Sequence, residues 1–240
     1  MEASMSFYTE FAEHYESIFP FSEDVYAFLR KHFPAPPARV LDIGCGTGHY
    51  ARRLAADGYE TVGIDLDPAM IANAQAHYPQ AEFRVLDMTE IRCLDGRFDA
   101  IACIGNTAAH LMQAQFADLV ADVAALLRPR GIWILQLMNW DYVLTQDTIT
   151  FPVIKGEDNA VFYRAYRDIS ETQVTFATRL EVAGTDVFED EVPLYPIRTT
   201  EIVALHTEYG FVLVTHAGSY SGAPFDPTTF SADLYVCERA

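Results

Sequence analysis

The sequence predicts an α/β protein with a doubly wound parallel sheet, and two observations lead to this fold class. Short apolar runs alternate with segments of helical pattern, as expected for βαβ units and a parallel sheet. These runs are 40–43, 61–64, 83–86, 98–104 and 132–138. The first run also passes through a glycine-rich turn directly into an expected helix, Tyr50–Ala56, at the kind of position where open α/β sheets hold ligands.

The turn after the first strand contains three glycines at alternate positions, Gly44, Gly46 and Gly48. Glycine has no Cβ, so it can turn sharply and let the backbone approach a ligand. The spacing Gly-x-Gly-x-Gly differs from the Gly-x-Gly-x-x-Gly of dinucleotide sites. Asp42 stands just before the loop, where it would repel a pyrophosphate and attract a cation. We therefore expect the loop to hold a positively charged ligand.

The second expected strand, Glu60–Ile64, leads into Asp65. This acid follows the loop by about 20 residues, where a carboxylate can accept hydrogen bonds from both ribose hydroxyls. A nucleoside with a positive charge and no phosphate meets both conditions, and S-adenosylmethionine is such a molecule. Simpler roles stay open for single residues. Asp65 could cap the helix that begins at Pro68, and Asp87 could be a turn residue.

Five motifs in order resemble those of the class I S-adenosylmethionine-dependent methyltransferases, over about residues 38–138. They are Val40–His49, Gly63–Met70, Leu86–Met88, Phe98–Asn106 and Leu126–Ile134. The resemblance implies S-adenosylmethionine as cofactor, S-adenosylhomocysteine as product, and a seven-stranded Rossmann-like sheet with an antiparallel edge strand. It also implies contacts between the donor and Asp42, Gly44, Cys45, Gly46, Gly48, Asp65, Leu66, Met70, Asp87, Met88, Cys103 and Tyr15.

Residues 1–37 are expected to form a helical segment ahead of the core at 38–138, with a proline-rich turn, Pro34–Pro37, between them. Apolar residues recur in this segment at roughly helical spacing, which is typical of an amphipathic helix against the core. They are Phe7, Tyr8, Phe11, Tyr15, Ile18 and Phe19. In the resembled family such a helix closes over the methyl donor, which would place Tyr15 near the donor's carboxylate. The sequence leaves packing and lid roles open.

The chain changes character after residue 138. Residues 139–198 are expected to form an antiparallel β meander inserted on the acceptor side, because short runs rich in Thr, Val, Phe and Tyr are separated by turn sequences. The expected strands are 148–156, 160–169, 172–183 and 186–194. Residues 199–240 should return to the core as a helix at 199–209 and strands at 211–218 and 231–238.

Two phrases narrow the resemblance to the glycine N-methyltransferase group of small-molecule enzymes. Gly105–Leu111 is similar to its Gly-Asn-Ser-x-x-His-Leu phrase, and Asn139–Leu144 to the phrase after its fifth strand. In that group an arginine just before the asparagine anchors the substrate's carboxylate, whereas this chain has Met138. A missing guanidinium argues against glycine as acceptor, unless Arg164, Arg167 or Arg198 replaces it.

Methyl transfer asks mainly for positioning, and an amine need only arrive neutral, whereas a hydroxyl needs a base. Asn106 is the candidate for orienting the acceptor, and His110 for a base, an acceptor contact or a structural residue. The expected acceptor pocket comprises Tyr8, Met138, Asn139, Tyr195 and Tyr220. We expect N-directed transfer. O-methylation of a quinone or polyketide-like acceptor and a non-catalytic binding subunit are the alternatives.

Composition limits the partners. The 240 residues include 34 acidic and 16 basic side chains, a formal net charge of −18, which argues against nucleic acid and anionic membrane partners. The four cysteines show no metal spacing, so no metal site is expected. The sequence shows no leader-like or membrane-length apolar run. We therefore expect a cytoplasmic protein with a small-molecule acceptor; a homodimer stays open.

Overall fold

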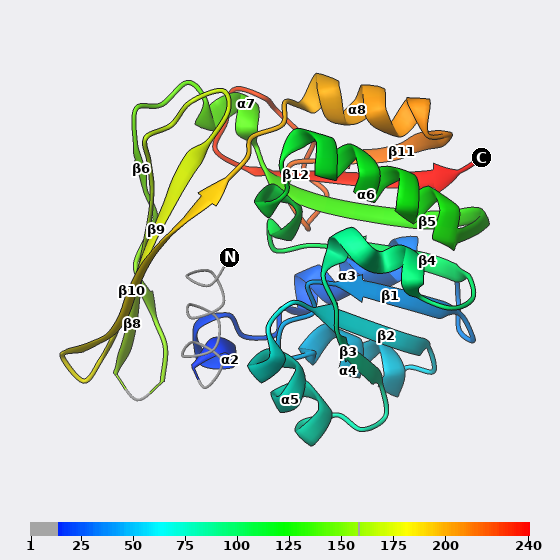
Figure 1. Cartoon of the computed structure of the whole chain (residues 1–240), viewed down its shortest axis with the longest axis horizontal. Helices are drawn as coiled ribbons and strands as arrows, with labels where there is room; N and C mark the ends of the chain where they lie inside the picture. Colours follow the sequence, from blue (N-terminus) through cyan, green and yellow to red (C-terminus); the bar gives the residue numbers. More distant parts are fainter. Residues whose placement is uncertain (1–13, 158) are drawn as a thin grey trace.

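The computed structural model describes residues 14–157 and 159–240, and it contains two sheets (Figure 1). Sheet A has seven strands in the order β11-β12-β5-β4-β1-β2-β3. Its parallel strands are β1 (Arg39–Ile43), β2 (Glu60–Asp65), β3 (Glu82–Val85), β4 (Phe98–Cys103) and β5 (Leu127–Met138). β12 (Ala232–Arg239) runs antiparallel to β5, and β11 (Phe211–Ala217) runs antiparallel to β12. The predicted sheet is confirmed, with the reversed strand β12 lying one place inside the edge strand β11.

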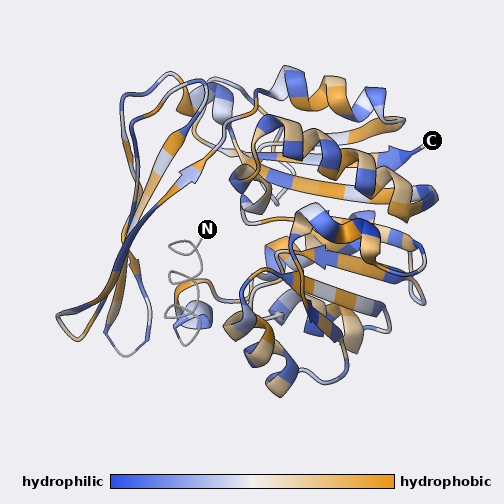
Figure 2. Cartoon of the chain, viewed as in Figure 1, coloured by the Kyte–Doolittle hydropathy of each residue, from blue (hydrophilic) through white to orange (hydrophobic). Residues whose placement is uncertain are grey.

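Helices cover both faces of sheet A, because successive side chains of its strands point to opposite sides. Val40 packs in one cluster with α3 and α4, whereas Leu41 packs in another with α6 and α8. Strands buried on both faces need nearly continuous apolar sequence, and the strands of sheet A are largely hydrophobic in Figure 2. The helices and turns are α3 (Glu23–His32), α4 (His49–Ala56), α5 (Pro68–His77), η1 (Met88–Cys93), η2 (Thr107–His110), α6 (Gln113–Leu126), α7 (Trp140–Val143) and α8 (Thr199–Glu208).

Sheet B is the inserted meander, and all of its pairings are antiparallel. Its strands are β6 (Ile149–Thr150), β7 (Ile154–Lys155), β8 (Ala160–Arg167), β9 (Val174–Val182) and β10 (Thr185–Leu194). The order is β10-β9-β8-β6, with β7 also paired to β8. The meander is as expected, except that the run 148–156 forms two short strands. Pro152 lies at the break, where a residue without an N–H cannot continue the ladder.

β5 also differs from the expectation. The strand was expected to begin at 132 after a turn, but it begins at Leu127. A register shift between Phe98 and Ala100 of β4 accommodates the extra residues, and Arg130 takes the left-handed conformation there, with φ 64°. The turn-like residues are therefore an irregularity within a longer strand.

α2 (Tyr15–Ile18) lies between the two sheets (Figure 1). Its Glu16 accepts hydrogen bonds from Thr47 Oγ1 at 2.8 Å and from the hydroxyl of Tyr78 at 3.2 Å. On the other side, Ile18 is buried in a cluster that includes Phe162 of sheet B. α2 thus connects the turn after β1 with the meander. In the described part of the chain, no helix is long and apolar enough to cross a membrane.

Candidate active site

The glycine loop after β1 is fixed to the end of β2. The backbone N–H groups of Gly44 and Cys45 both donate to the carbonyl of Ile64, at 2.8 and 2.9 Å. Gly44 and Gly46 have φ of 72° and 55°, a region that favours glycine. A Cβ on Gly44 would come within 2.5 Å of Thr107, and one on Gly46 within 3.2 Å of the Tyr15 ring. Both positions therefore favour glycine by conformation, and Gly44 also lacks room for a Cβ, whereas a Cβ on Gly46 would need a small shift of the Tyr15 ring.

Asp65 is held over this loop by two backbone donors. Its Oδ2 accepts from the N–H of Gly46 at 2.9 Å, and its Oδ1 accepts from the N–H of Asp67 at 3.0 Å. Burial raises the pKa of Asp65, and these hydrogen bonds oppose the rise. The helix-cap alternative for Asp65 is wrong, because Asp67 caps α5 by accepting from the N–H groups of Ala69 and Met70. Each Asp65 oxygen keeps a lone pair for a ligand hydroxyl.

Asp42 is buried beneath the loop with 5% of its surface exposed. Burial, reinforced by the charge of Asp65, raises the pKa of Asp42 to about 7. A cation above the loop would stabilise the ionised form of both carboxylates. This local charge suits a positively charged ligand and opposes a phosphate.

The other residues predicted to contact the methyl donor differ in their exposure and in their hydrogen bonds. Asp87 caps η1 by accepting from the N–H and hydroxyl of Thr89, both at 2.8 Å. Met88 is half-buried, and Leu66 is 49% exposed. Met70 is 1% exposed and packs in the cluster of Ile18 and Phe162, so its side chain joins α5 to the meander.

Two predicted residues are buried thiols. Cys45 lies in the glycine loop and Cys103 ends β4. Burial raises the pKa of both thiols, so both stay neutral and serve as small packing groups. Within the described residues, no group of three or more His, Cys, Asp or Glu side chains could hold a metal ion.

The turn after β4 brings Asn106 to the ends of β5 and β8. Asn106 has φ 63°, its Oδ1 accepts from the N–H of Met138 at 2.9 Å, and its Nδ2 donates to the hydroxyl of Tyr166 at 3.3 Å. Gln136 was missed by sequence reasoning. Its Oε1 accepts from the N–H groups of Gly105 and Asn106 at 2.8 and 3.2 Å. The sequence signal for this role is that Gln136 is an amide side chain within the apolar run 132–138.

His110 ends η2 and is half-buried. Burial lowers the pKa of His110 to about 4, so its imidazole is neutral at pH 7 and a weak base there. The chain after β10 returns beside it, because the N–H of Tyr195 donates to the carbonyl of Ala109 at 2.7 Å. The structure thus brings the backbone of Tyr195 beside Ala109, the residue before His110.

The remaining predicted acceptor residues separate into different roles. Asn139 is fully buried and caps α7, and its Nδ2 donates to the carbonyls of Asp226 and Thr229 at 3.0 and 2.8 Å. Its polar groups are therefore used within the fold. Met138 is half-buried. The hydroxyl of Tyr220 donates to Gln136 at 3.5 Å, and burial raises its pKa. Tyr8 lies outside the described residues.

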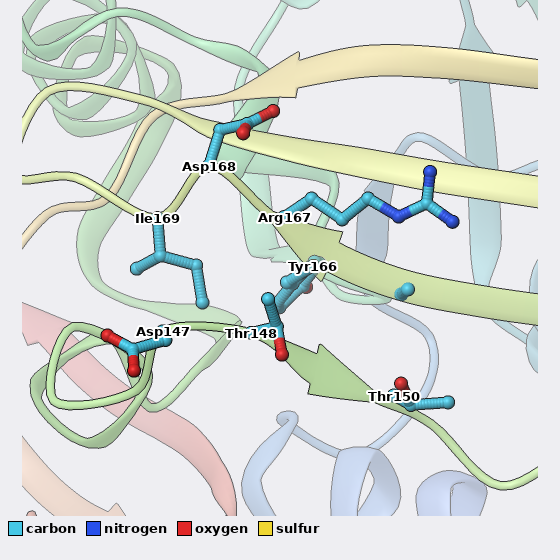
Figure 3. A pocket seen from close by; sticks show the side chains of 8 residues that line it. Asp147, Thr148, Thr150, Tyr166, Arg167, Asp168 and Ile169 are labelled. Carbon is cyan, nitrogen blue, oxygen red and sulfur yellow. The ribbon is translucent and has the colours of Figure 1, made fainter.

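A hollow of about 510 Å³ lies elsewhere, between the segment before β6 and the end of β8 (Figure 3). Asp147, Thr150, Arg167 and Asp168 contribute to its lining. Neither the glycine loop nor Asp65 lines it. The candidate site is therefore defined by the loop, the buried Asp42, the half-buried Asp65 and the ends of β4 and β5.

Residues 40–131 match the model of a family described as methyltransferase domain. This range contains the glycine loop, Asp65 and Asp87, and it spans strands β1 to β4 of sheet A, whereas the inserted meander lies outside it. Residues 40–131 thus carry a methyltransferase domain, and the match, the motifs and the sheet topology support a class I S-adenosylmethionine-dependent methyltransferase with S-adenosylmethionine as cofactor. The residues present fit this cofactor, because the glycine loop lies beside Asp42 and Asp65, two carboxylates that favour a positively charged ligand.

Curated relatives include N-methyltransferases. A glycine/sarcosine N-methyltransferase from Parasynechococcus marenigrum is 28% identical over 191 residues, which cover 75% of this chain and 65% of the relative. A dTDP-3-amino-3,6-dideoxy-alpha-D-glucopyranose N,N-dimethyltransferase from Streptomyces fradiae is 35% identical over 115 residues, 47% of this chain and 44% of that protein. The chain therefore spans less than two thirds of the length of these relatives.

The fold is shared more widely. The solved structure of an S-adenosylmethionine-dependent methyltransferase from Clostridium acetobutylicum superposes with a TM-score of 0.81 at 14% identity. The match covers 97% of this chain and 99% of that chain. Sheet A and sheet B together are thus a known architecture, which supports the fold and not a substrate.

Proposed function

We propose that this protein transfers a methyl group from S-adenosylmethionine to an amine nitrogen of a small molecule. The observation that carries the proposal is the Asp65 carboxylate, fixed by the N–H of Gly46 at 2.9 Å beside a loop whose three glycines have positive φ. The names of the two curated relatives support nitrogen as the atom that is methylated.

In this proposal the donor is held by the ends of β1, β2 and β3. Asp65 accepts from the ribose hydroxyls, Asp87 from the adenine amino group, and Tyr15 covers the loop at the donor's carboxylate end. The bound cofactor supplies a methyl group on a positively charged sulfur. Asp42 and Asp65 favour that charge, because the attraction between opposite charges is strong in a buried site.

The acceptor is proposed to bind between the ends of β4 and β5 and sheet B. Asn106 fixes the geometry of this wall by joining Met138 to Tyr166, and positioning is the main requirement of a direct displacement. His110 is neutral at pH 7, with a pKa near 4, so it can exchange a hydrogen bond with an acceptor but removes a hydroxyl proton poorly. A neutral amine needs no such removal before attack.

The arrangement of the two sheets supports a small acceptor. Sheet B and α2 stand over the ends of the strands of sheet A (Figure 1), which favours a small molecule. The net charge of −18 disfavours nucleic acid. The cytoplasmic location and the homodimer stay predictions of the sequence.

The test is transfer of a labelled methyl group to a panel of aminosugars, amino acids, alkylamines and phenols, with products identified by mass spectrometry. We expect N-methylated products that disappear in Asp65→Ala. Methylation of phenols alone would favour the O-directed alternative. Tight donor binding without transfer to any acceptor would favour a binding subunit.

A further inference from the structure

One face of sheet B is turned toward the candidate site at both ends of β8. At one end, the hydroxyl of Tyr166 accepts a hydrogen bond from Asn106. At the other end, the ring of Phe162 lies 5.7 Å from that of Phe19, next to α2. Alternate residues of a strand share a face, so Arg164 lies between these two contacts on the same face.

The register extends this arrangement into a polar row across three strands. Arg164 pairs with Thr178 of β9, and Thr178 pairs with Asp190 of β10. Apolar rows flank it on both sides. They are Phe162–Leu180–Phe188 and Tyr166–Phe176–Val192. A wall that only packed against the core would gain by being apolar throughout, so the polar row needs another explanation.

Arg164 differs from the other two arginines that the sequence offers as carboxylate ligands. Arg167 pairs with Glu191 at 3.3 Å, and Arg198 pairs with Asp141 at 3.1 Å. Arg164 has no acidic side chain within ion-pair distance among the residues that the structure describes. Its guanidinium lies 5.0 Å from the ring of Phe151 and donates one long hydrogen bond, 3.4 Å, to the carbonyl of Pro152.

Two atoms of the row are buried without a hydrogen-bond partner in the described structure, Arg164 Nε and Asp190 Oδ2. Burial lowers the pKa of Arg164, because removing water from the guanidinium penalises its charge. Leaving a buried donor or acceptor unpaired is costly. A ligand oxygen that accepts from Arg164 Nε would remove the cost at that atom, whereas ring packing of Arg164 alone would not.

We infer that Arg164 binds an anionic group, a carboxylate or a phosphate, of the acceptor whose amine is methylated. The inference rests on the proposed function. Its second support is Met138, which contributes no cation at the end of β5. Arg164 supplies a guanidinium from the opposite wall, and a guanidinium matches two oxygens of either anion.

The experiment compares amines that differ in one anionic group. Glucosamine 6-phosphate is paired with glucosamine, and β-alanine with propylamine, at saturating donor. We expect at least one anionic amine to exceed its neutral partner about tenfold or more in kcat/KM, mainly through KM.

Arg164→Met removes this preference and Arg164→Lys retains part of it. Arg167→Met is the matched control, because its side chain points to the other face of β8, and it keeps the wild-type ratio. Arg164→Gln replaces Arg164→Met if that variant fails to fold.

A binding measurement separates this inference from the proposed function. Inorganic phosphate and malonate are titrated by calorimetry into protein saturated with S-adenosylhomocysteine. Anion binding that Arg164→Met weakens about tenfold and Arg167→Met leaves unchanged supports the role of Arg164, even if no amine is methylated. Equal rates for charged and neutral amines in the wild type, or anion binding that is absent or insensitive to Arg164→Met, overturn it. The phosphate and carboxylate arms identify which anion is preferred.

Discussion

The donor end of sheet A and the facing wall of sheet B differ in whether their charged side chains have hydrogen-bond partners within the protein. At the donor end, the carboxylate of Asp65 accepts two backbone hydrogen bonds and thus is fixed before any ligand binds. On sheet B, Arg164 and Asp190 keep buried polar atoms without partners. The first region is preorganised for one cofactor. The second region has donors and acceptors that a substrate must satisfy, which is where relatives with different acceptors can differ.

The largest expected effect tests the preorganised side. Asp65→Ala removes two charge-assisted hydrogen bonds, each worth about 1.5–3 kcal/mol, so the Kd for S-adenosylmethionine should rise by about a hundredfold or more. Calorimetry measures the affinity, and circular dichroism confirms the fold. Asp24→Ala, an exposed acid in the first turn of α3, is the control. Unchanged affinity in folded Asp65→Ala would show that another group holds the ribose.

The second effect concerns protonation on the acceptor side. The pKa of His110 falls from 6.5 to about 4 on folding, so the unfolded chain binds this proton more readily than the native protein. The contribution of neutral His110 to the free energy of unfolding is fully present above pH 6.5. It is lost as pH falls toward 4, and its upper bound is about 3 kcal/mol. Urea unfolding of wild type and His110→Gln across this range measures it. The difference between the two proteins should shrink toward acid, and a constant difference would contradict the lowered pKa.

A smaller effect tests Asn106, whose hydrogen bonds connect sheet A to sheet B. Asn106→Ala leaves the N–H of Met138 and the hydroxyl of Tyr166 without their partner, at a cost of about 1–3 kcal/mol. We expect the rate of methyl transfer to fall about ten- to a hundredfold while donor affinity stays near wild type. Gln173→Ala, an exposed amide before β9, should change neither quantity. A parallel loss of donor affinity would place Asn106 on the donor side instead.

The smallest effect concerns glycine. Met138 provides no cation at the end of β5, so a carboxylate buried there would be poorly compensated. We expect no appreciable glycine turnover by the wild type, and about a tenfold gain over that background in Met138→Arg. Initial rates at saturating donor decide the matter. Robust methylation of glycine by the wild type, abolished in Arg164→Met, would show that Arg164 serves even this short acceptor.

The sequence by itself determined the elements whose cause is local. Alternating apolar runs and helical segments specified the strands and helices of sheet A, because each strand must be buried on both faces. The glycine loop could be located from the alternating spacing of its glycines, and the φ values of 72° at Gly44 and 55° at Gly46 lie in a region that glycine adopts readily. The meander strands followed from β-rich runs and turn residues. Several strand ends differ by one or two residues, and the largest differences are at Pro152 and at Leu127–Gly131, where pairing between strands decided the outcome.

Tertiary structure alone decided which polar residues stay available for ligands. The sequence could not tell whether Asp65 or Asp67 caps α5, nor that Gln136 holds the turn before Asn106, because these roles depend on which atoms meet after the strands align. Asn139 looked like a pocket residue, yet its side chain is consumed by the loop at 226–229. The register of β8 decides which face of sheet B carries the Arg164 side chain. A shift of one residue would place Arg167 on the face toward the candidate site instead. A site feature that depends on local backbone conformation can be predicted from the sequence. A feature that depends on contacts between strands distant in the sequence is known only once the fold is known.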